Sequence, residues 1–453
     1  MAHRYQTDAQ RQTRRTLNER GIEPGRGMGQ NFMTDRSIAA WIVDQLEVQP
    51  GETVIEIGPG MGALTEHLVT CAPRLILLEK DDQLVEEIRK RFGARPGVTV
   101  IHGDALNFDL RPFFKAQPLK IIGALPYSVG TEIVRRWLQN PSPVCRAVFT
   151  LQKEVCDRLC AAPGTSDYGL LSLRTQVRWQ ATMLRKLPPD IFVPRPKVDS
   201  GVVLLTPRSR AELPVYDEAL FDRLLAAGFS QRRKMLKNLL PPHDKPWEEL
   251  AAASGIHPMA RGQELTLNQW LSLTNAFAPG DSISIAQSGD EIFDVVDEQN
   301  VVVRQATRRE VHAQNWLHRA VHIFVLNAAG EVFLQLRSHL KDKQPCKWDS
   351  SAAGHLDAGE DYLNCAVREL EEELGIRTTA GELTPAGSVA ASAGTGWEFV
   401  DFFTVRWDGK LRWPAAEIET GQWFSPAEID AWTAARPQDF ADGFLECWRV
   451  WRS

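Results

Sequence analysis

The segment from Gly354 to Ile376 constrains the fold of this chain more than any other, because it holds one glycine, one arginine and several glutamates at fixed intervals. It reads GHLDAGEDYLNCAVRELEEELGI. Glu369, Glu372 and Glu373 are three and four residues apart, so a helix places them on one face. Like charges at that spacing repel, and a divalent cation removes the penalty because Mg²⁺ prefers carboxylate and phosphate oxygens. The segment predicts a metal site on a loop–helix–loop unit, although most acidic helix faces are simply solvated.

The spacing resembles the signature of the Nudix hydrolases, which cleave diphosphate linkages with Mg²⁺ or Mn²⁺. The resemblance implies that Glu369, Glu372 and Glu373 bind the metal and that Glu372 is also catalytic. It further implies that Arg368 orients these carboxylates, that Gly354 shapes the loop, and that the substrate is a small diphosphate-containing molecule. The motif lies in the last quarter of 453 residues.

Residues 291–453 alternate strand and helix patterns around this motif, and 318–338 reads as two strands joined by a short Ala-Ala-Gly turn. The stretches FDVVDEQNVVV, REVHAQNWLHRAVHIF and KWDSSAAGHLDAGE are similar to the isopentenyl-diphosphate isomerase branch of the superfamily and its hydrolase relatives. We therefore expect an α/β/α Nudix domain here.

Three histidines extend the resemblance to that branch. His312, His318 and His355 fall close to the three metal-binding histidines of the isomerases, with the first gap one residue short. The isomerase catalytic cysteine corresponds to Ala353, and together with the complete glutamate set this favours a hydrolase. Glu398 is a candidate extra ligand or general base, although an exposed loop glutamate usually has neither role.

A second, unrelated pattern lies in the first half of the chain. Residues 54–68, VIEIGPGMGALTEHL, read as a buried strand, a glycine-rich turn and a helix. Three more strands follow, and polar residues stand where they end: RLILLE ends in Glu79, VTVIHGDAL reaches Asp104, and KIIGALPY reaches Tyr127. Strands that alternate with helices and end in polar residues predict a doubly wound α/β sheet with a ligand at its carboxyl edge.

The Gly-x-Gly-x-Gly turn, Asp104 and the Leu-Pro-Tyr corner are similar to class I S-adenosylmethionine-dependent methyltransferases. More specifically, residues 25–275 resemble the rRNA adenine N6,N6-dimethyltransferase family. The motifs that carry this likeness are GQNFMTD, EIGPGMG, LQKEVCDRL, PGTSDYGLLS, FVPRPKVDSGVV and FSQRRKMLKNLL.

This resemblance implies a role for each matching position. Glu79 would hold the ribose of S-adenosylmethionine, Asp104 would bind near its adenine, and Tyr127 would stack on a flipped target adenine. Without the motif, Tyr127 would as readily be a core aromatic. The implied cofactor residues are Asn31, Met33, Gly58, Gly60, Glu79, Asp104 and Ala124, and the implied catalytic residues are Leu125, Pro126, Tyr127 and Phe192.

One position departs from the family pattern. The family has Asn immediately before Leu-Pro-Tyr, where its side-chain oxygen accepts a hydrogen bond from the target amine, and this chain has Ala124. Loss of one positioned polar group costs roughly 10²–10³ in rate, unless backbone carbonyls or Ser128 compensate. The alternative is a ribosome-assembly factor whose degenerate methyltransferase site only binds RNA.

Charge divides the chain in a way that suggests one polyanionic partner. Residues 1–277 hold 36 Lys and Arg against 30 Asp and Glu, whereas the remainder holds 16 against 28. The basic first part suits small-subunit rRNA or the small ribosomal subunit. FSQRRKMLKNLL is expected to be a helix that presents the RNA-binding residues Arg232, Arg233, Lys234 and Lys237, and the N-terminal arm adds Arg11, Arg14, Arg15, Arg20 and Arg26.

These patterns predict a methyltransferase domain over 1–207, a helical RNA-binding lobe over 208–277, a linker over 278–290 and a Nudix domain over 291–453. The seven cysteines are scattered without a pairing pattern, which is typical of a reduced, cytoplasmic setting. No signal peptide or membrane span is expected. A Nudix domain that only binds its ligand is the remaining rival, and the complete acidic set argues against it.

Overall fold

The computed structural model describes residues 11, 15, 19, 30–116, 118–278 and 289–453. The chain forms two compact units, Met1–Glu212 with Leu224–Trp270 and Leu213–Arg223 with Leu271–Ser453. The lobe expected over 208–277 is divided between these two units. The predicted domain boundaries therefore remain a prediction. Most of the expected linker, residues 279–288, and the arginines at 14, 20 and 26 lie outside the described residues.

The described part of the first unit is built on a seven-stranded sheet in the order β4-β3-β2-β5-β6-β9-β7. The strands from β2 to β6 run parallel, and β9 and β7 are antiparallel to their neighbours. The doubly wound sheet predicted from the sequence is confirmed. The strands are β2 Thr53–Ile57, β3 Arg74–Glu79, β4 Val98–His102, β5 Leu119–Ala124, β6 Val144–Gln152, β7 Trp179–Leu187 and β9 Ser200–Pro207.

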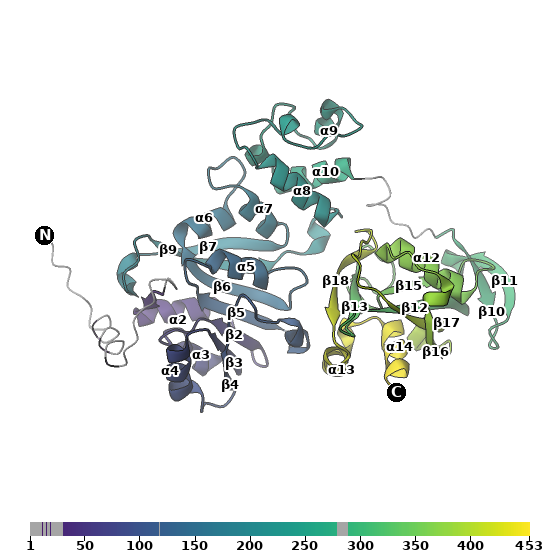
Figure 1. The fold of residues 1–453 in the computed structure, drawn as a ribbon, viewed down its shortest axis with the longest axis horizontal. Coiled ribbons are helices and arrows are strands. Elements are labelled where there is room, and N and C mark those ends of the chain that lie inside the picture. The colour runs from purple at the N-terminus through teal and green to yellow at the C-terminus, as the bar shows by residue number, and fades with distance from the viewer. Residues whose placement is uncertain (1–10, 12–14, 16–18, 20–29, 117, 279–288) are drawn as a thin grey trace. The chain divides into compact units, whose positions relative to one another are not determined.

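Helices cover both faces of this sheet (Figure 1). On one face, Ile42 of α2, Leu68 of α3 and Ile88 of α4 pack in one apolar cluster, and on the other Trp137 of α5 and Leu159 of α6 pack in a second. The helices are α2 Arg36–Asp44, α3 Thr65–Cys71, α4 Asp82–Phe92, α5 Gly130–Trp137, α6 Lys153–Cys160 and α7 Leu170–Gln176, with short 3₁₀ turns η1 Arg111–Ala116, η2 Pro189–Ile191 and η3 Arg210–Glu212. A separate pair of two-residue strands, β1 Phe32–Met33 and β8 Phe192–Val193, runs antiparallel.

The region predicted as a helical lobe is helical, but its basic segment is not. The helices are α8 Glu218–Gly228, α9 Trp247–Ala253 and α10 Leu267–Phe277, with 3₁₀ turns η4 Leu236–Asn238 and η5 Gly262–Glu264. The helix expected over 229–240 was wrong: α8 ends at Gly228, and residues 229–234 form turns and bends. The backbone N–H of Leu236 donates to the carbonyl of Ala260 instead of to a preceding turn, so tertiary contacts override the local helical pattern.

The second unit contains a mixed sheet ordered β14-β13-β12-β17-β16, with β15 paired to β12 and β18 paired to β13. The predicted strand pair of 318–338 is confirmed, since β12 and β13 are antiparallel across the Ala-Ala-Gly turn. The strands are β12 His318–Leu326, β13 Val332–Arg337, β14 Trp348–Asp349, β15 Ala352–His355, β16 Thr384–Val389, β17 Glu398–Arg406 and β18 Ile418–Phe424.

Helix α12, Tyr362–Leu374, packs on β12 and β15 (Figure 1) and buries Ala366, Leu370 and Leu374. The other helices are α11 Arg308–Gln314, α13 Pro426–Ala435 and α14 Asp442–Arg452, with 3₁₀ turns η7 Ala380–Glu382, η8 Ala393–Thr395 and η9 Pro437–Asp439.

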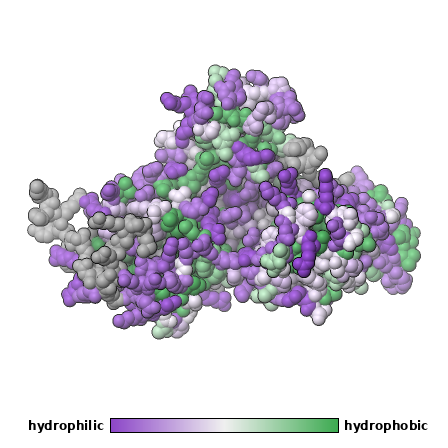
Figure 2. Space-filling model, in the orientation of Figure 1, coloured by the Kyte–Doolittle hydropathy of each residue, from purple (hydrophilic) through white to green (hydrophobic). Residues whose placement is uncertain are grey.

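A separate hairpin of β10, Ile292–Val296, and β11, Val302–Thr307, exposes Val301, Val302 and Val303, and hydrophobic atoms gather at that edge in Figure 2. Among the described residues, no helix combines the length and apolar character that crossing a bilayer requires.

Candidate functional sites

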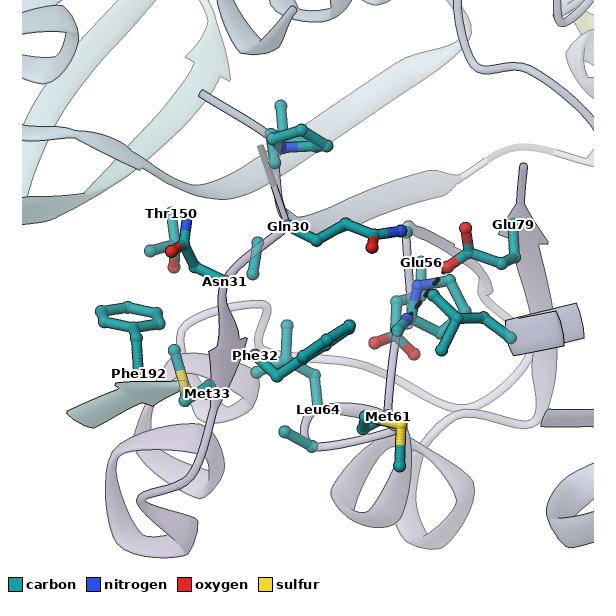
Figure 3. Close-up of a pocket in the computed structure, with 18 of the residues that line it drawn as sticks. Gln30, Asn31, Phe32, Met33, Glu56, Met61, Leu64, Glu79, Thr150 and Phe192 are labelled. Carbon is teal, nitrogen blue, oxygen red and sulfur yellow. Dashed lines mark hydrogen bonds between the residues drawn. The ribbon is translucent and has the colours of Figure 1, made fainter. Parts of the chain in front are cut away.

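A pocket opens in the first unit where β2, β5 and β6 end, between these strands and the β1–β8 pair (Figure 3). Asn31 and Met33 line it beside Phe192, and Glu56 and Glu79 lie across from them in that view. Of the residues predicted to form this site, Asn31, Met33, Gly58, Gly60, Glu79, Ala124, Leu125, Pro126, Tyr127 and Phe192 line the pocket. Asp104 is the one predicted residue that does not line it.

The glycine-rich turn between β2 and α3 requires glycine for two reasons. Gly58, Gly60 and Gly62 have φ angles of +66°, +54° and +81°, a region that side chains disfavour. A Cβ on Gly60 would also stand 3.1 Å from the ring of Phe32, and one on Gly62 would stand 2.8 Å from Phe92. The turn therefore brings bare backbone to the pocket wall.

Glu79 ends β3 as a buried carboxylate that fixes the glycine turn. Its Oε2 accepts the N–H of Gly60 at 3.0 Å, and its Oε1 accepts those of Lys80 and Asp81 at 2.8 and 3.1 Å. Burial raises the pKa of Glu79, and the hydrogen bonds oppose that shift. A carboxylate oxygen has two lone pairs, so Oε2 keeps capacity for a ligand hydroxyl.

Asp104 instead forms an ion pair outside the pocket. Its Oδ2 lies 2.7 Å from Lys80 Nζ, and its Oδ1 accepts the N–H of Leu106 at 2.9 Å. The Lys80 hydrogen bond and the Leu106 N–H lower the pKa of Asp104. Any contact with a ligand adenine therefore requires a ligand that extends beyond the pocket wall.

The Leu-Pro-Tyr corner follows β5 directly. Leu125 donates its N–H to the carbonyl of Thr150 at 3.0 Å, and the hydroxyl of Tyr127 is hydrogen-bonded to Ser200 Oγ. Burial raises the pKa of Tyr127. The hydroxyl end of Tyr127 is thus held by β9, and Tyr127 lines the pocket.

Three polar residues that line the pocket, Gln30, Glu56 and Thr150, were missed in the sequence. Glu56 is buried within β2, where its carboxylate accepts the hydroxyl of Thr65 at 2.6 Å, and burial raises its pKa to about 8. Thr150 of β6 also lines the pocket. An acid before the glycines was visible in EIGPGMG, whereas no sequence signal marked Thr150.

In the second unit, α12 presents the acidic cluster. Asp361 caps the helix by accepting the N–H of Asn364, and Gly375 ends it at a φ of +66°. Glu369 and Glu373 are buried, and Glu372 is exposed. Burial together with the charge of Glu373 raises the pKa of Glu369 to about 8.

Arg368 joins this cluster to the loop before the helix. Its Nη1 lies 2.8 Å from Glu369 Oε1 and 3.2 Å from Glu372 Oε2, and its Nη2 lies 2.9 Å from Glu360 Oε2. Nη2 also donates to the carbonyl of His355 at 3.0 Å. One guanidinium therefore fixes three carboxylates and β15.

Glu373 is held from the other side. Its Oε2 accepts the N–H of Ala353 at 3.1 Å and the amide of Gln335 at 3.0 Å, and Lys341 Nζ lies 3.7 Å from its Oε1. Gln335 and Lys341 are both buried. The carboxylate is thus positioned by strand β13, strand β15 and the loop after β13.

His312, His318, His355 and Glu398 converge beside the acidic helix. One ligand atom from each lies within 4.8 Å of the others. Glu398 Oε1 is 3.0 Å from His355 Nε2 and 3.5 Å from His318 Nε2, and strand pairing sets His318 directly beside Glu398. Burial and the neighbouring histidines lower the pKa of His312 to about 3, which keeps that imidazole neutral.

These two groups of residues share one cavity of about 800 Å³. It is lined by two histidines of the cluster, His312 and His355, and by Glu398. Three glutamates of α12 and two arginines also line it: Glu369, Glu372, Glu373, Arg337 and Arg368. Acidic, imidazole and guanidinium groups therefore face the same space.

Comparison with known proteins identifies the family of the first unit. A family model described as ribosomal RNA adenine dimethylase matches residues 26–279, more than half of the chain. The chain belongs to the ribosomal RNA adenine dimethylase family. A NUDIX domain model matches residues 316–443, so this dimethylase family member also carries a NUDIX domain.

Two curated relatives of this dimethylase are matched over almost their whole length. The ribosomal RNA small subunit methyltransferase A of Geobacter metallireducens is 39% identical over 264 residues, covering 56% of this chain and 96% of that protein. The protein of the same name from Thiobacillus denitrificans is 41% identical over 251 residues, covering 55% and 96%. A solved structure of the 23S rRNA methyltransferase ErmE matches with a TM-score of 0.45 at 26% identity, covering 55% of this chain and 99% of that chain.

The basic residues predicted to bind RNA lie on the surface of the dimethylase half. Arg232, Arg233, Lys234 and Lys237 are exposed. The first three stand in turns after α8, and Lys237 stands in η4. Arg232 donates to the carbonyl of Ser166 at 2.9 Å, which ties this segment to the loop before α7.

Proposed function

We propose that the first unit dimethylates the N6 amine of adenine in small-subunit rRNA with S-adenosylmethionine as the methyl donor. The observation that carries this proposal is the shared pocket of Gly58, Glu79 and the Leu125–Tyr127 corner. A glycine turn and a buried acid suit a nucleoside cofactor. An aromatic corner at the same pocket suits a base removed from its stack.

The donor set of the pocket fits that cofactor. Glu79 keeps a free lone pair at Oε2, which accepts a ribose hydroxyl, and Gly58 and Gly60 let the ligand approach bare backbone. When bound, S-adenosylmethionine supplies an electrophilic methyl group. Tyr127 and Phe192 offer aromatic faces for the target base, and Ser200 holds the Tyr127 ring in place. Together these residues bind, orient and exclude water.

The exposed basic segment supports an RNA partner. Arg232, Arg233, Lys234 and Lys237 would neutralise phosphates, and each such contact adds to the salt dependence of binding. Replacing all four with Gln should weaken binding to small ribosomal subunits and flatten its salt dependence. Unchanged salt dependence would place the RNA contact elsewhere.

The direct experiment is transfer of labelled methyl groups to unmethylated small ribosomal subunits. We expect incorporation that stops at two methyl groups per target adenine. The rival, an assembly factor with a degenerate site, predicts tight binding to the subunit and the cofactor without transfer.

We further propose that the NUDIX domain hydrolyses a small diphosphate-containing molecule with Mg²⁺ bound at Glu369, Glu372 and Glu373. The residues fit a divalent ion because two of these carboxylates are buried together, and the ion would offset the repulsion that raises the pKa of Glu369. A metal ion here supplies charge for phosphate oxygens and a more acidic bound water. Arg368 holds two of these carboxylates, Glu369 and Glu372, in place.

The histidine cluster supports a second metal centre in the same cavity. His318 Nε2 is buried and, within the described residues, has no hydrogen-bond partner. An imidazole-rich set with one carboxylate favours Zn²⁺, Mn²⁺ or Fe²⁺ over Mg²⁺. Glu398, predicted as an extra metal ligand, would bind this second metal ion together with the three histidines.

Glu372→Gln tests the hydrolase proposal. Its side chain is exposed, so the variant should fold normally while hydrolysis of diphosphate substrates falls by at least about 10². Glu371→Gln is the matched control, because Glu371 is the adjacent glutamate and pairs with Arg377 instead. Equal turnover in the two variants would remove the metal assignment.

A further inference from the structure

A buried hydroxyl in the methyltransferase pocket lacks a partner. Thr150 lies on β6, its side chain is 2% exposed, and its Oγ1 has no hydrogen-bond partner among the described residues. A buried polar group of this kind is costly and rare in folded proteins, so it calls for a specific explanation. Its position on the pocket wall, where Figure 3 labels it near Asn31, provides one.

Strand register places Thr150 directly beside Ala124. The two are paired across the parallel strands β5 and β6, just as Ile122 is paired with Val148 two residues earlier. Side chains alternate between the faces of a sheet, so Thr150 and Val148 share a face, and so do Ala124 and Ile122. Neighbouring strands are about 4.8 Å apart, so the hydroxyl stands within one strand spacing of the Ala124 methyl.

Other polar side chains of the pocket already have partners. Tyr127 is bonded to Ser200, Glu56 to Thr65, and Glu79 to three backbone N–H groups. Ser128, the other hydroxyl considered in the sequence, does not line the pocket in the described structure.

We infer that Thr150 Oγ1 accepts a hydrogen bond from the amine of the target adenine and so takes the place that Ala124 leaves without an acceptor. A hydrogen bond to one N–H turns the nitrogen lone pair away from Thr150 and toward the methyl donor. This inference rests on the proposed methyltransferase function and adds a residue that touches the substrate.

The test compares Thr150→Val with Thr53→Val. Both threonines are buried and have an unpartnered hydroxyl in the described structure, but Thr53 begins β2, away from the pocket. Removing either hydroxyl should raise Tm by about 2–4 °C, because an unsatisfied group is lost. Only Thr150→Val should slow methyl transfer to unmethylated small subunits, by about 10²-fold.

Two further variants separate the hydroxyl from the shape of the side chain. Thr150→Ser keeps the acceptor and should retain most of the rate. Adding Ala124→Asn to Thr150→Val should restore transfer, because the new amide oxygen stands one strand away. Cofactor affinity, measured by calorimetry, should be equal in the natural chain, Thr150→Val and Thr150→Ser.

The outcomes distinguish this inference from the function on which it rests. Full transfer by Thr150→Val, or a Thr150→Ser variant as slow as Thr150→Val, would overturn the role of Thr150 and leave the methyltransferase proposal intact. An unmodified chain that transfers nothing until Ala124→Asn is introduced would overturn both.

Discussion

Gly354 lies so close to Glu369 that a Cβ at position 354 would stand 2.0 Å from Glu369 Oε1. Gly354 is on β15, and Glu369 is on the facing side of α12. The φ of Gly354 is outside the left-handed region, so the backbone does not demand glycine there. The requirement comes from the carboxylate, which needs the space that a side chain would fill.

Gly354→Ala should therefore displace Glu369 and disable the NUDIX domain. A methyl group forced against a buried carboxylate costs about 1–3 kcal/mol of stability, and the displaced ligand should lower hydrolysis by about 10² or more. Metal titration by calorimetry and turnover of a diphosphate substrate measure both effects.

Gly381→Ala is the control for that variant. A Cβ at Gly381 meets nothing within 4 Å, and its backbone is not in the left-handed region. It should leave metal affinity and hydrolysis unchanged. Normal metal affinity in Gly354→Ala would show that Glu369 is not a ligand.

Arg368→Lys should weaken hydrolysis although it keeps the charge. A lysine ammonium cannot contact Glu360, Glu369 and Glu372 at once as the guanidinium does. We expect a loss of about 10-fold or more in kcat, with a raised Mg²⁺ requirement. Arg377→Lys, at an exposed pair with Glu371, is the control, and equal kinetics in the two variants would contradict this role.

His318→Gln should remove the second metal centre without removing the first. Its ring is buried among His312, His355 and Glu398, so the variant should lose about one equivalent of bound transition metal in elemental analysis. His339→Gln, at a histidine paired with Glu419, should keep it. Equal metal content in both variants would mean that the histidines are packed without an ion.

Glu56 should make the first unit less stable at alkaline pH. Burial raises its folded-state pKa to about 8 from an ordinary 4.5. The protonated carboxyl therefore contributes stability that is complete below about pH 4.5 and is lost as the pH rises through about 8, on the order of a few kcal/mol.

Glu56→Gln should abolish that loss, because the amide oxygen still accepts from Thr65 and carries no charge. In thermal denaturation from about pH 5 to about pH 9, the Tm of Glu56→Gln should increase relative to that of the natural protein as the pH rises. The exposed Glu86→Gln should follow the natural protein. Parallel curves for Glu56→Gln and the natural protein would show that Glu56 is ionised in the folded state.

The inner strands β2, β3 and β5 of the first unit were predictable because each is mostly buried and reads as an apolar run, as in RLILLE. The 229–240 helix failed because local pattern does not record a tertiary bond such as Leu236 to Ala260.

The site residues also include some that the sequence predicts and some that it does not. Motifs located Glu79, Tyr127 and the α12 glutamates, because their spacing along the chain reflects one turn or one helix. Thr150 was not predictable, because its proposed role depends on Ala124. That residue is 26 positions away in the sequence and is paired with Thr150 on the adjacent strand. Asp104 was expected at the cofactor, and the structure pairs it with Lys80 outside the pocket.

Removing residues 285–453 should leave methyl transfer intact. Curated relatives are matched over 96% of their length by little more than half of this chain, so their length leaves no room for a NUDIX domain. Transfer rates of the shortened and full chains on the same subunits test this. A shortened chain that is folded but inactive would show that the two halves depend on each other.

The most direct test of the whole account is mass spectrometry of small-subunit rRNA after incubation of unmethylated subunits with the natural chain and S-adenosylmethionine. We expect N6,N6-dimethyladenosine despite Ala124. Subunits that bind the protein yet carry no methylated adenine would contradict it, and would favour an assembly factor with a degenerate site.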